Sequence, residues 1–151
     1  MSNIIDKYNV SVPRYTSYPP ANYFHELEAS DYLEAVVRSN EEGSKKLSFY
    51  LHMPFCKRLC HYCGCNSYIM PSSGDTVAKY IDAIHKEIDL VTALIDESRP
   101  ISQIHFGGGS PTAMPTSVLK EINEHLLSLF PTIERPEIAI ECHPGYLTEE
   151  D

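Results

Sequence analysis

Residues 47–65 read LSFYLHMPFCKRLCHYCGC, and the rest of the chain is organised around this stretch. Its first half alternates between apolar and polar side chains, which is the periodicity of a β-strand. Four of the chain's five cysteines follow within ten residues, in the spacing C-x3-C-x2-C-x-C. Thiolates this dense on a short loop suit an iron–sulfur cluster or zinc. The stretch therefore predicts a strand that runs into a metal-binding loop, with a redox cluster as the first interpretation.

The sequence beyond the cysteines alternates between helix and strand patterns. Residues 77–95 carry apolar side chains three or four apart, as an amphipathic helix does. Residues 102–106 and 137–142 read as strands, and a second helix that begins at Thr116 lies between them. This alternation predicts βαβ units, a parallel sheet and right-handed crossovers. The expected fold class is α/β, consisting of the first three parallel strands and the crossover helices of an incomplete (β/α) barrel.

The last residues, Leu147–Asp151, have the pattern of a helix start, with Thr148 as the cap and acidic residues in the first turn. No helix follows to cover the third strand, and a three-stranded parallel sheet with a bare edge is an unusual finished domain. We therefore interpret the sequence as the N-terminal portion of a larger β/α barrel or doubly wound sheet.

Polar side chains occupy one face of all three predicted strands, although a fully buried parallel sheet should be apolar on both faces. The positions on this face are Ser48, Tyr50, His52, Gln103, His105 and Glu141, together with the small apolar Ala139. A barrel explains the pattern if the aliphatic set faces the helices and the polar set faces the interior. The cysteines, Gly107–Gly109 and Glu141 also lie at or after strand ends, where β/α folds place their active sites.

The N-terminal region, residues 1–45, differs in character from residues 46–151, and we expect it to be an arm with a short helix. Prolines in residues 13–19 favour an extended or turning arm whose tyrosines dock on the body. Ser30–Asp31 reads as the start of the helix. The side chains expected to point inward from it are Leu33, Val36 and Val37.

Composition narrows the class of protein. The chain has 151 residues, 42% of them hydrophobic, and a net charge of −9, so its surface as a whole does not attract nucleic acid or an anionic membrane. No apolar stretch approaches the roughly 20 residues of a membrane span, and Met1–Lys7 lacks the pattern of a signal peptide. An odd number of cysteines argues for the reducing cytoplasm and against a disulfide framework.

The cysteine spacing separates the two metal interpretations only in part. Zinc usually takes two well-separated C-x2-C pairs or mixed Cys and His ligands, and His52 and His61 keep zinc as an alternative. A ferredoxin run has C-x2-C-x2-C with a distant fourth ligand, whereas the first gap here is three residues.

Cys56-x3-Cys60-x-Tyr62-Cys63 resembles the signature of the radical S-adenosylmethionine (SAM) superfamily. The resemblance implies that Cys56, Cys60 and Cys63 bind three irons of a [4Fe–4S] cluster. It also implies that the fourth iron is open to the amino and carboxylate groups of SAM. A coordination site left free for substrate distinguishes catalytic from structural metal sites.

Further motifs resemble the oxygen-independent coproporphyrinogen III oxidase (dehydrogenase) family, over nearly the whole chain. They are His52–Cys56, the additional Cys65, Gly107–Thr112 and the early run Pro13–Pro19. That family has a much longer chain, in agreement with the incomplete barrel, which would be of the radical SAM type.

The family resemblance also implies binding positions for two SAM molecules. Tyr50, Gly108 and Glu141 match contacts of the cluster-bound SAM, and Tyr62, Gly109 and Ser110 match contacts of a second SAM. Glycines allow close approach, and their N–H groups can meet a carboxylate. Glu141 offers an acceptor for an ammonium or ribose hydroxyl group. The alternatives are a plain βα turn for the glycines and a solvated strand end for Glu141.

The activity implied by this resemblance is the oxidative decarboxylation of two propionates of coproporphyrinogen III to vinyl groups, which gives protoporphyrinogen IX for haem synthesis. SAM is cleaved to methionine and a 5′-deoxyadenosyl radical that abstracts a hydrogen from the substrate. The implied partners are a porphyrinogen and an unidentified electron donor, and the complete protein is expected to be a monomer. Arg14 is a candidate for pairing with a substrate carboxylate.

Two other functions stay open. The chain could be a related radical SAM protein, namely a haem-handling protein or a methyltransferase, or a non-catalytic fragment that binds zinc or a cluster. We expect the isolated 151-residue chain to be inactive.

The remaining cysteines and histidines are expected outside the cluster ligands. Cys65 follows Cys63 too soon to reach a separate cluster corner, so it receives a supporting or redox role. His61, His85 and His125 are expected to be solvated. The pair Cys142–His143 departs from the Val-Asp pair expected of the family; Cys142 is interpreted as a small buried hydrophobe, and His143 is given no catalytic role.

Overall fold

A computed structural model of the chain describes residues 4–9 and 20–148. The chain divides into two compact units, residues 1–32 and residues 33–151. The predicted arm of residues 13–19, which includes Arg14, lies outside the described residues, and so does the helix expected after Thr148.

The first unit contains short helical elements and exposed apolar side chains. Its elements are α1 (Ile4–Tyr8), the 3-10 turn η1 (Ala21–Tyr23) and the start of α2 (Ala29–Glu42). The start of α2 is fixed by Asp31, whose carboxylate accepts a hydrogen bond from the backbone N–H of Glu28 at 3.1 Å. This contact is half of a capping box, in which an acidic side chain in the first turn reaches back to the capping residue.

The expectation that α2 buries Leu33, Val36 and Val37 is wrong, because no residue of this helix is buried. Polar groups hold its C-terminal end instead. The Asn40 side chain donates to the carbonyl of Leu94 and accepts from the backbone N–H of Asp96. An apolar stripe predicts burial only where another apolar surface faces it.

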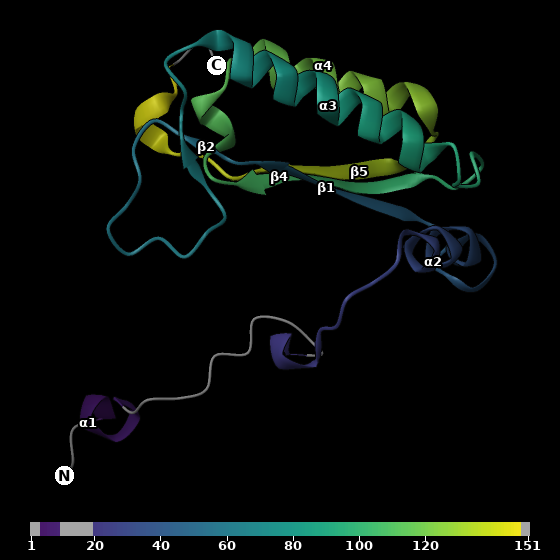
Figure 1. Cartoon of the computed structure of the whole chain (residues 1–151), viewed down its shortest axis with the longest axis horizontal. Coiled ribbons are helices and arrows are strands. Elements are labelled where there is room, and N and C mark those ends of the chain that lie inside the picture. The colour runs from purple at the N-terminus through teal and green to yellow at the C-terminus, as the bar shows by residue number, and fades with distance from the viewer. Residues whose placement is uncertain (1–3, 10–19, 149–151) are drawn as a thin grey trace. The chain divides into compact units, whose positions relative to one another are not determined.

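The second unit is built on the parallel sheet that the sequence predicts (Figure 1). Its strands are β1 (Leu47–Met53), β4 (Ile101–Gly108) and β5 (Thr132–Ile140), in the order β1-β4-β5. The helices α3 (Gly74–Thr92) and α4 (Thr116–Leu129) lie together on one face of it (Figure 1). The sheet is not closed into a barrel, and the α/β class with three parallel strands is confirmed.

Strand β5 begins at Thr132, several residues before the predicted strand. The extra segment contains Pro136, which cannot donate to a ladder and therefore argues against a strand when only the sequence is considered. An edge strand tolerates proline, and β5 is at the edge of this sheet.

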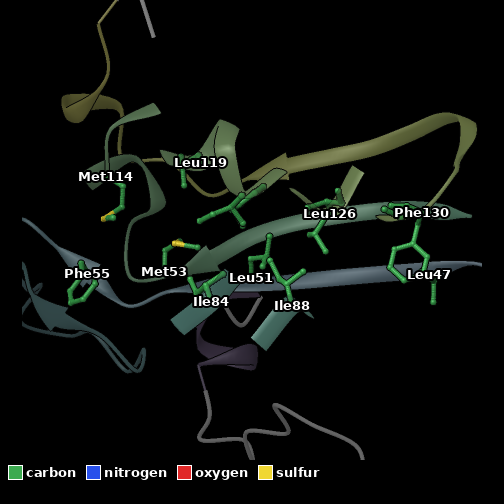
Figure 2. Close-up of a cluster of buried hydrophobic side chains, with 14 residues drawn as sticks. Leu47, Leu51, Met53, Phe55, Ile84, Ile88, Met114, Leu119, Leu126 and Phe130 are labelled. Carbon is green, nitrogen blue, oxygen red and sulfur yellow. The ribbon is translucent and has the colours of Figure 1, made fainter. Parts of the chain in front are cut away.

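The core fills the space between the helices and the sheet (Figure 2). Met53, Ile104 and Phe106 from the strands and Leu126 from α4 are almost completely buried. Each such side chain contributes about 1.5–3 kcal/mol relative to an exposed position. The aliphatic side chains of β1 and β4 therefore face the helices, as the sequence predicts.

The buried apolar core does not extend to β5, the third strand of the sheet. Ile138 and Ile140 of β5 are 46% and 45% exposed. With Phe106 and Leu119 they line a groove of about 520 Å³ beside α4. Both isoleucines belong to the aliphatic set, so this part of the apolar face is present but only half covered.

The helices within the described residues include none long and apolar enough to cross a lipid bilayer.

Candidate functional site

The cysteine loop is closed at its base by a second, small parallel sheet. Strand β2 (Phe55–Cys56) pairs with β3 (Tyr68–Ile69). The backbone N–H of Tyr68 donates to the carbonyl of Pro54 at 2.7 Å, and that of Met70 donates to the carbonyl of Cys56 at 2.8 Å. Both ends of the loop are therefore fixed beside the end of β1. The sequence did not predict this pairing, since two-residue strands have no periodicity.

His52 and Tyr80 attach the loop to the sheet and to α3. His52 Nε2 lies 2.8 Å from the carbonyl oxygen of Asn66, and because a carbonyl can only accept, this ring nitrogen carries the proton. The Tyr80 hydroxyl donates to the backbone carbonyl of His52 at 2.6 Å, and its ring meets Phe55 edge-on at 5.4 Å. Burial, followed by the charges of Glu87 and Tyr50, raises the pKa of Tyr80.

The three predicted cluster ligands open into one pocket of about 250 Å³. Its lining comes from the ends of all three strands. The lining residues are Cys56, Arg58, Leu59, Cys60, Cys63, Gly109, Ser110, Glu141, Cys142, His143 and Tyr146. The sequence anticipated six of these positions and assigned no site role to Arg58, Leu59, Cys142, His143 and Tyr146.

The thiols of Cys56, Cys60 and Cys63 in this pocket are chemically suited to an iron–sulfur cluster, because cysteine thiolates are the ligands that such clusters take. Across residues 4–9 and 20–148, no three His, Cys, Asp or Glu side chains are gathered around one point as metal ligands. Cys60 and Cys63 are exposed on the loop, and Cys56 at its base is half-buried. The structure thus brings the thiols to one pocket without gathering them at one position.

Hydrogen bonds distinguish the sulfur atoms from one another. The backbone N–H of Cys65 donates to Cys63 Sγ at 3.4 Å, and the Ser67 hydroxyl lies 3.9 Å from the same sulfur. These two contacts lower the pKa of Cys63, the backbone N–H having the larger effect. The pKa of Cys65 is raised, chiefly by its side-chain hydrogen bond to Cys63 and by the charge of that residue.

The pKa of Cys56 is raised, whereas that of Cys63 is lowered. Burial is the main cause that raises the pKa of Cys56, and the nearby charges of Cys63 and Cys60 add to it. A hydrogen bond from Ser67 offsets part of this increase. The Ser67 hydroxyl is therefore near both ends of the ligand set, a position that the sequence did not single out.

The three glycines at the end of β4, Gly107–Gly109, allow close contacts with the chain's own site residues. A Cβ at Gly107 would lie 2.8 Å from the Tyr50 ring, and one at Gly109 would lie 2.9 Å from Cys56 Sγ. At Gly108 the backbone has φ of +115°, which L side chains rarely adopt, and a Cβ would lie 2.9 Å from the His52 ring. Side chains at these positions would displace the loop or Tyr50.

The expected role of the backbone N–H groups in this turn is different in the structure. We expected the glycine N–H groups to be available to a ligand carboxylate. The N–H of Gly109 instead donates to the carbonyl of Met53 at 2.8 Å, and that of Ser110 donates to the carbonyl of Phe55 at 3.1 Å. The turn uses these donors to hold the cysteine loop against the end of β4.

A polar row crosses the face of the sheet that the helices leave open. Tyr50 stacks on His105 with ring centroids 5.7 Å apart, and His105 Nε2 lies 3.2 Å from Glu141 Oε1. The Tyr50 hydroxyl lies 3.2 Å from His52 Nδ1, which accepts because His52 carries its proton on Nε2. Burial and then the charge of Glu141 raise the pKa of Tyr50. The strand pattern predicted this shared face, although it did not identify His105 as the partner of Glu141.

The segment after β5 lines the pocket directly and is held there by Thr112, whose hydroxyl accepts a hydrogen bond from the backbone N–H of His143 at 3.0 Å. The His143 ring stacks on Tyr146 at 4.2 Å. Lys57 Nζ lies 4.6 Å from the centroid of the Tyr146 ring, in the geometry of a cation–π contact. The interpretation of Cys142 as a buried hydrophobe is wrong, because it is exposed and lines the pocket.

Tyr62 is the predicted site residue that lies apart from the others. It is 92% exposed on the cysteine loop and does not line the pocket. Tyr50 and Gly108 do not line the pocket either. Tyr50 lies near Glu141, since a Cβ at Gly107 would meet both side chains, and Gly108 directly precedes Gly109 in the chain. Cys65 also lies beside the pocket, through its contact with Cys63.

A sequence model of the Radical SAM superfamily matches residues 50–151. The oxygen-independent coproporphyrinogen III oxidase of Synechocystis sp. is 37% identical over 150 residues, which are 99% of this chain and 32% of that protein. A protein of the same name from Mannheimia haemolytica is 37% identical over 142 residues, covering 93% of this chain and 94% of that sequence. The chain thus spans about a third of the length of the Synechocystis relative.

A solved structure of coproporphyrinogen III oxidase from Escherichia coli, described as a radical SAM enzyme, superposes with a TM-score of 0.78. The two chains are 34% identical, and the match covers 96% of this chain and 31% of that chain.

Proposed function

We propose that this chain, which belongs to the radical SAM superfamily and within it to the oxygen-independent coproporphyrinogen III oxidase family, supplies the cofactor-binding part of a coproporphyrinogen III dehydrogenase. The observation that carries the proposal is the single pocket into which Cys56, Cys60 and Cys63 open, next to Gly109 and Glu141. A C-x3-C-x2-C set at the end of a parallel strand has the ligands and the location that radical SAM chemistry requires.

In this proposal the three cysteines hold a [4Fe–4S] cluster with one open iron. Tyr50, Gly108 and Glu141 contact the SAM at that iron, and Tyr62, Gly109 and Ser110 contact a second SAM. The bound cluster supplies one electron for the reductive cleavage of SAM. The hard chemistry belongs to these cofactors, and the protein supplies ligation and orientation.

Contacts within the chain orient the Glu141 carboxylate, which in this proposal accepts a hydrogen bond from SAM. Glu141 accepts a hydrogen bond from His105 at 3.2 Å, and Tyr50 stacks on the same imidazole. These contacts fix one carboxylate oxygen and leave the other for an ammonium or hydroxyl group of the ligand. We assign His105 as a positioning residue for Glu141.

The proposed reaction converts two propionates of coproporphyrinogen III to vinyl groups and gives protoporphyrinogen IX. SAM is the oxidant: for each propionate one SAM ends as methionine and 5′-deoxyadenosine, which takes up the hydrogen, and one carbon dioxide is lost. The names of the relatives support this choice of substrate. We propose the cytoplasm as its compartment, an electron donor as its partner and a monomer as the complete protein. In this proposal residues 46–151 form the barrel part and residues 1–45 the arm, in which Arg14 pairs with a substrate carboxylate.

Turnover needs more than the described residues in this proposal. The sheet is unclosed, and Ile138 and Ile140 on its last strand are half exposed. In the polar row, Tyr50 is 59% exposed and the Glu141 side chain is 52% exposed, on the side that a complete barrel would enclose. We therefore expect the 151-residue chain to bind the cofactors and to lack coproporphyrinogen turnover.

The test is anaerobic reconstitution with iron and sulfide, followed by analysis of bound iron, sulfide and zinc. We expect equal amounts of iron and sulfide in the chain, and loss of both in Cys56→Ala, with Cys142→Ala as the matched control. Because the 151-residue chain is expected to be inactive, bound iron and sulfide are the readout, and cleavage of SAM to methionine and 5′-deoxyadenosine is not expected of it. Stoichiometric zinc without iron would favour the metal-binding module instead.

A further inference from the structure

Two histidines of the helix layer lie against each other, apart from the cysteine pocket. His85 is on α3 and His125 is on α4, helices that run side by side over the sheet (Figure 1). Their Nδ1 atoms are 2.8 Å apart and their ring centroids 5.0 Å. The prediction that both rings are solvated is wrong, because their side chains are only 23% and 22% exposed.

Each imidazole also faces a carboxylate of the opposite helix. His125 Nε2 lies 3.0 Å from Asp89 Oδ1, and His85 Nε2 lies 3.7 Å from Glu121 Oε1. His85 and Asp89 are one turn apart on α3, and Glu121 and His125 are one turn apart on α4, so each pair shares one helix face. The two helices thus present the same kind of His–carboxylate pair to each other.

The two ring protons of neutral imidazoles cannot serve the three contacts, which are Nδ1 with Nδ1 and each Nε2 with its carboxylate. If His125 Nε2–H donates to Asp89, its Nδ1 must accept, and the proton of His85 has to lie on Nδ1. His85 Nε2 then presents a lone pair to the carboxylate of Glu121. This nitrogen is buried and has no hydrogen-bond partner. An unpartnered buried polar atom points to an unaccounted group such as an ion.

A cation between the Nδ1 atoms, either one additional proton or a metal ion, removes this shortage. With a metal ion there, both Nδ1 lone pairs face it and both Nε2–H groups point to carboxylates. The distance to Asp89 is 3.0 Å, whereas the 3.7 Å to Glu121 is longer than a hydrogen bond. Metal–nitrogen bonds of about 2.0–2.1 Å at angles near 90–110° place two ligand nitrogens roughly 2.8–3.4 Å apart. The observed 2.8 Å is at the short end of that range. A carboxylate that accepts the other N–H of a ligating histidine is the usual support of such a ligand.

We propose that His85 and His125 bind a divalent transition-metal ion of the class that prefers imidazole, such as Ni²⁺, Cu²⁺ or Zn²⁺. Asp89 and Glu121 orient the two rings, and water completes the coordination, since both carboxylates are exposed. The described part of the chain gathers no three protein ligands around one metal, so this is a two-histidine site with open positions. It links α3 to α4 and is independent of the proposed function.

The test uses Ni²⁺ and the full 151-residue chain with its cysteines replaced by serine, so that thiols do not compete. Equilibrium dialysis should give one Ni²⁺ per chain, and Ni²⁺ should raise the Tm because only the folded chain holds the two helices together. His85→Asn and His125→Asn should abolish binding. The matched control is His105→Gln, which removes the other His–carboxylate pair and should bind as the parent does.

Two further variants separate loss of the site from loss of the fold. Asp89→Asn and Glu121→Gln keep both imidazoles and should each weaken Ni²⁺ binding about 10–100-fold, with an unchanged circular dichroism spectrum. Absence of binding in the parent chain would overturn the proposal. So would equal affinity in the His85→Asn/His125→Asn double variant, or Asp89→Asn and Glu121→Gln variants that fold and bind as tightly as the parent.

Discussion

Gly109 and Cys56 lie close together in the lining of the pocket. The glycine turn is therefore packed against the first proposed cluster ligand. A Cβ at residue 109 would lie 2.9 Å from Cys56 Sγ and from the carbonyl oxygen of Pro54, and 3.0 Å from that of Phe55. Two of these three neighbours are backbone atoms, so a rotamer change cannot relieve the overlap.

Gly109→Ala should therefore destabilise the metal-free chain by about 1–3 kcal/mol, as overpacking usually does. It should also lower the iron bound after reconstitution, because the substitution displaces Cys56. Urea denaturation and iron analysis measure the two effects. Gly74→Ala is the matched control, since a Cβ there meets nothing within 4 Å. Equal stability and iron content in both variants would contradict the contact.

Cys63 should be more reactive than Cys65 and Cys56 in the metal-free chain. Hydrogen bonds lower its pKa, whereas those of Cys65 and Cys56 are raised. Near pH 8 a lowered pKa gives a larger thiolate fraction, and the thiolate is the nucleophile. Timed alkylation with iodoacetamide, followed by peptide mass spectrometry, should show Cys63 modified before Cys65 and Cys56.

Ser67→Ala should slow the alkylation of Cys63, because one of the contacts that lower its pKa is removed. The same change should leave the exposed Cys142 unaffected, which makes that residue the internal control. If Cys65 reacts before Cys63 in the parent chain, the assigned direction of hydrogen bonding between them is incorrect.

At the scale of elements, the junction between β1 and α3 depends on Tyr80. Its hydroxyl donates to the carbonyl of His52 at the end of β1, and its ring contacts Phe55 at the base of the loop. Tyr80→Phe keeps the ring contact and removes the hydrogen bond. We expect a loss of about 0.5–1.5 kcal/mol at neutral pH, measured by urea denaturation.

The same tyrosine gives the junction a pH dependence. Burial raises the folded-state pKa of Tyr80 above its usual value of 10.0. A raised pKa contributes stability that is fully present below the unfolded pKa and is lost as the pH rises through the folded pKa. The difference in unfolding free energy between parent and Tyr80→Phe should therefore shrink above pH 10. A constant difference between pH 8 and pH 11 would argue against burial of this hydroxyl.

At the scale of the whole molecule, every residue that lines the pocket lies between Cys56 and Tyr146. That interval falls inside residues 50–151, which match the superfamily, and inside the second compact unit. Removing residues 1–28, which leaves α2 complete, should therefore not change the iron and sulfide bound after reconstitution. A clear fall in bound iron would show that the first unit contributes to the pocket.

Local patterns in the sequence determined the parts of the structure that depend on neighbouring residues. Strand alternation predicted β1 and the shared polar face, and helical spacing predicted α3 and α4. The cysteine spacing and the strand ends placed Cys56, Cys60 and Cys63 together, and these three line one pocket, although the sequence did not predict that Cys142 joins them. These features follow from periodicities of two and 3.6 residues and from the geometry of parallel sheets.

Tertiary structure alone decided the contacts between distant residues. Parallel register placed His105 between Tyr50 and Glu141, and the adjacent helices α3 and α4 brought His85 to His125. The exposure of α2 also depends on tertiary structure. The helix has an apolar stripe, yet none of its residues is buried. Sequence periodicity fixes which face a side chain occupies, whereas its partner depends on register and on which surfaces meet.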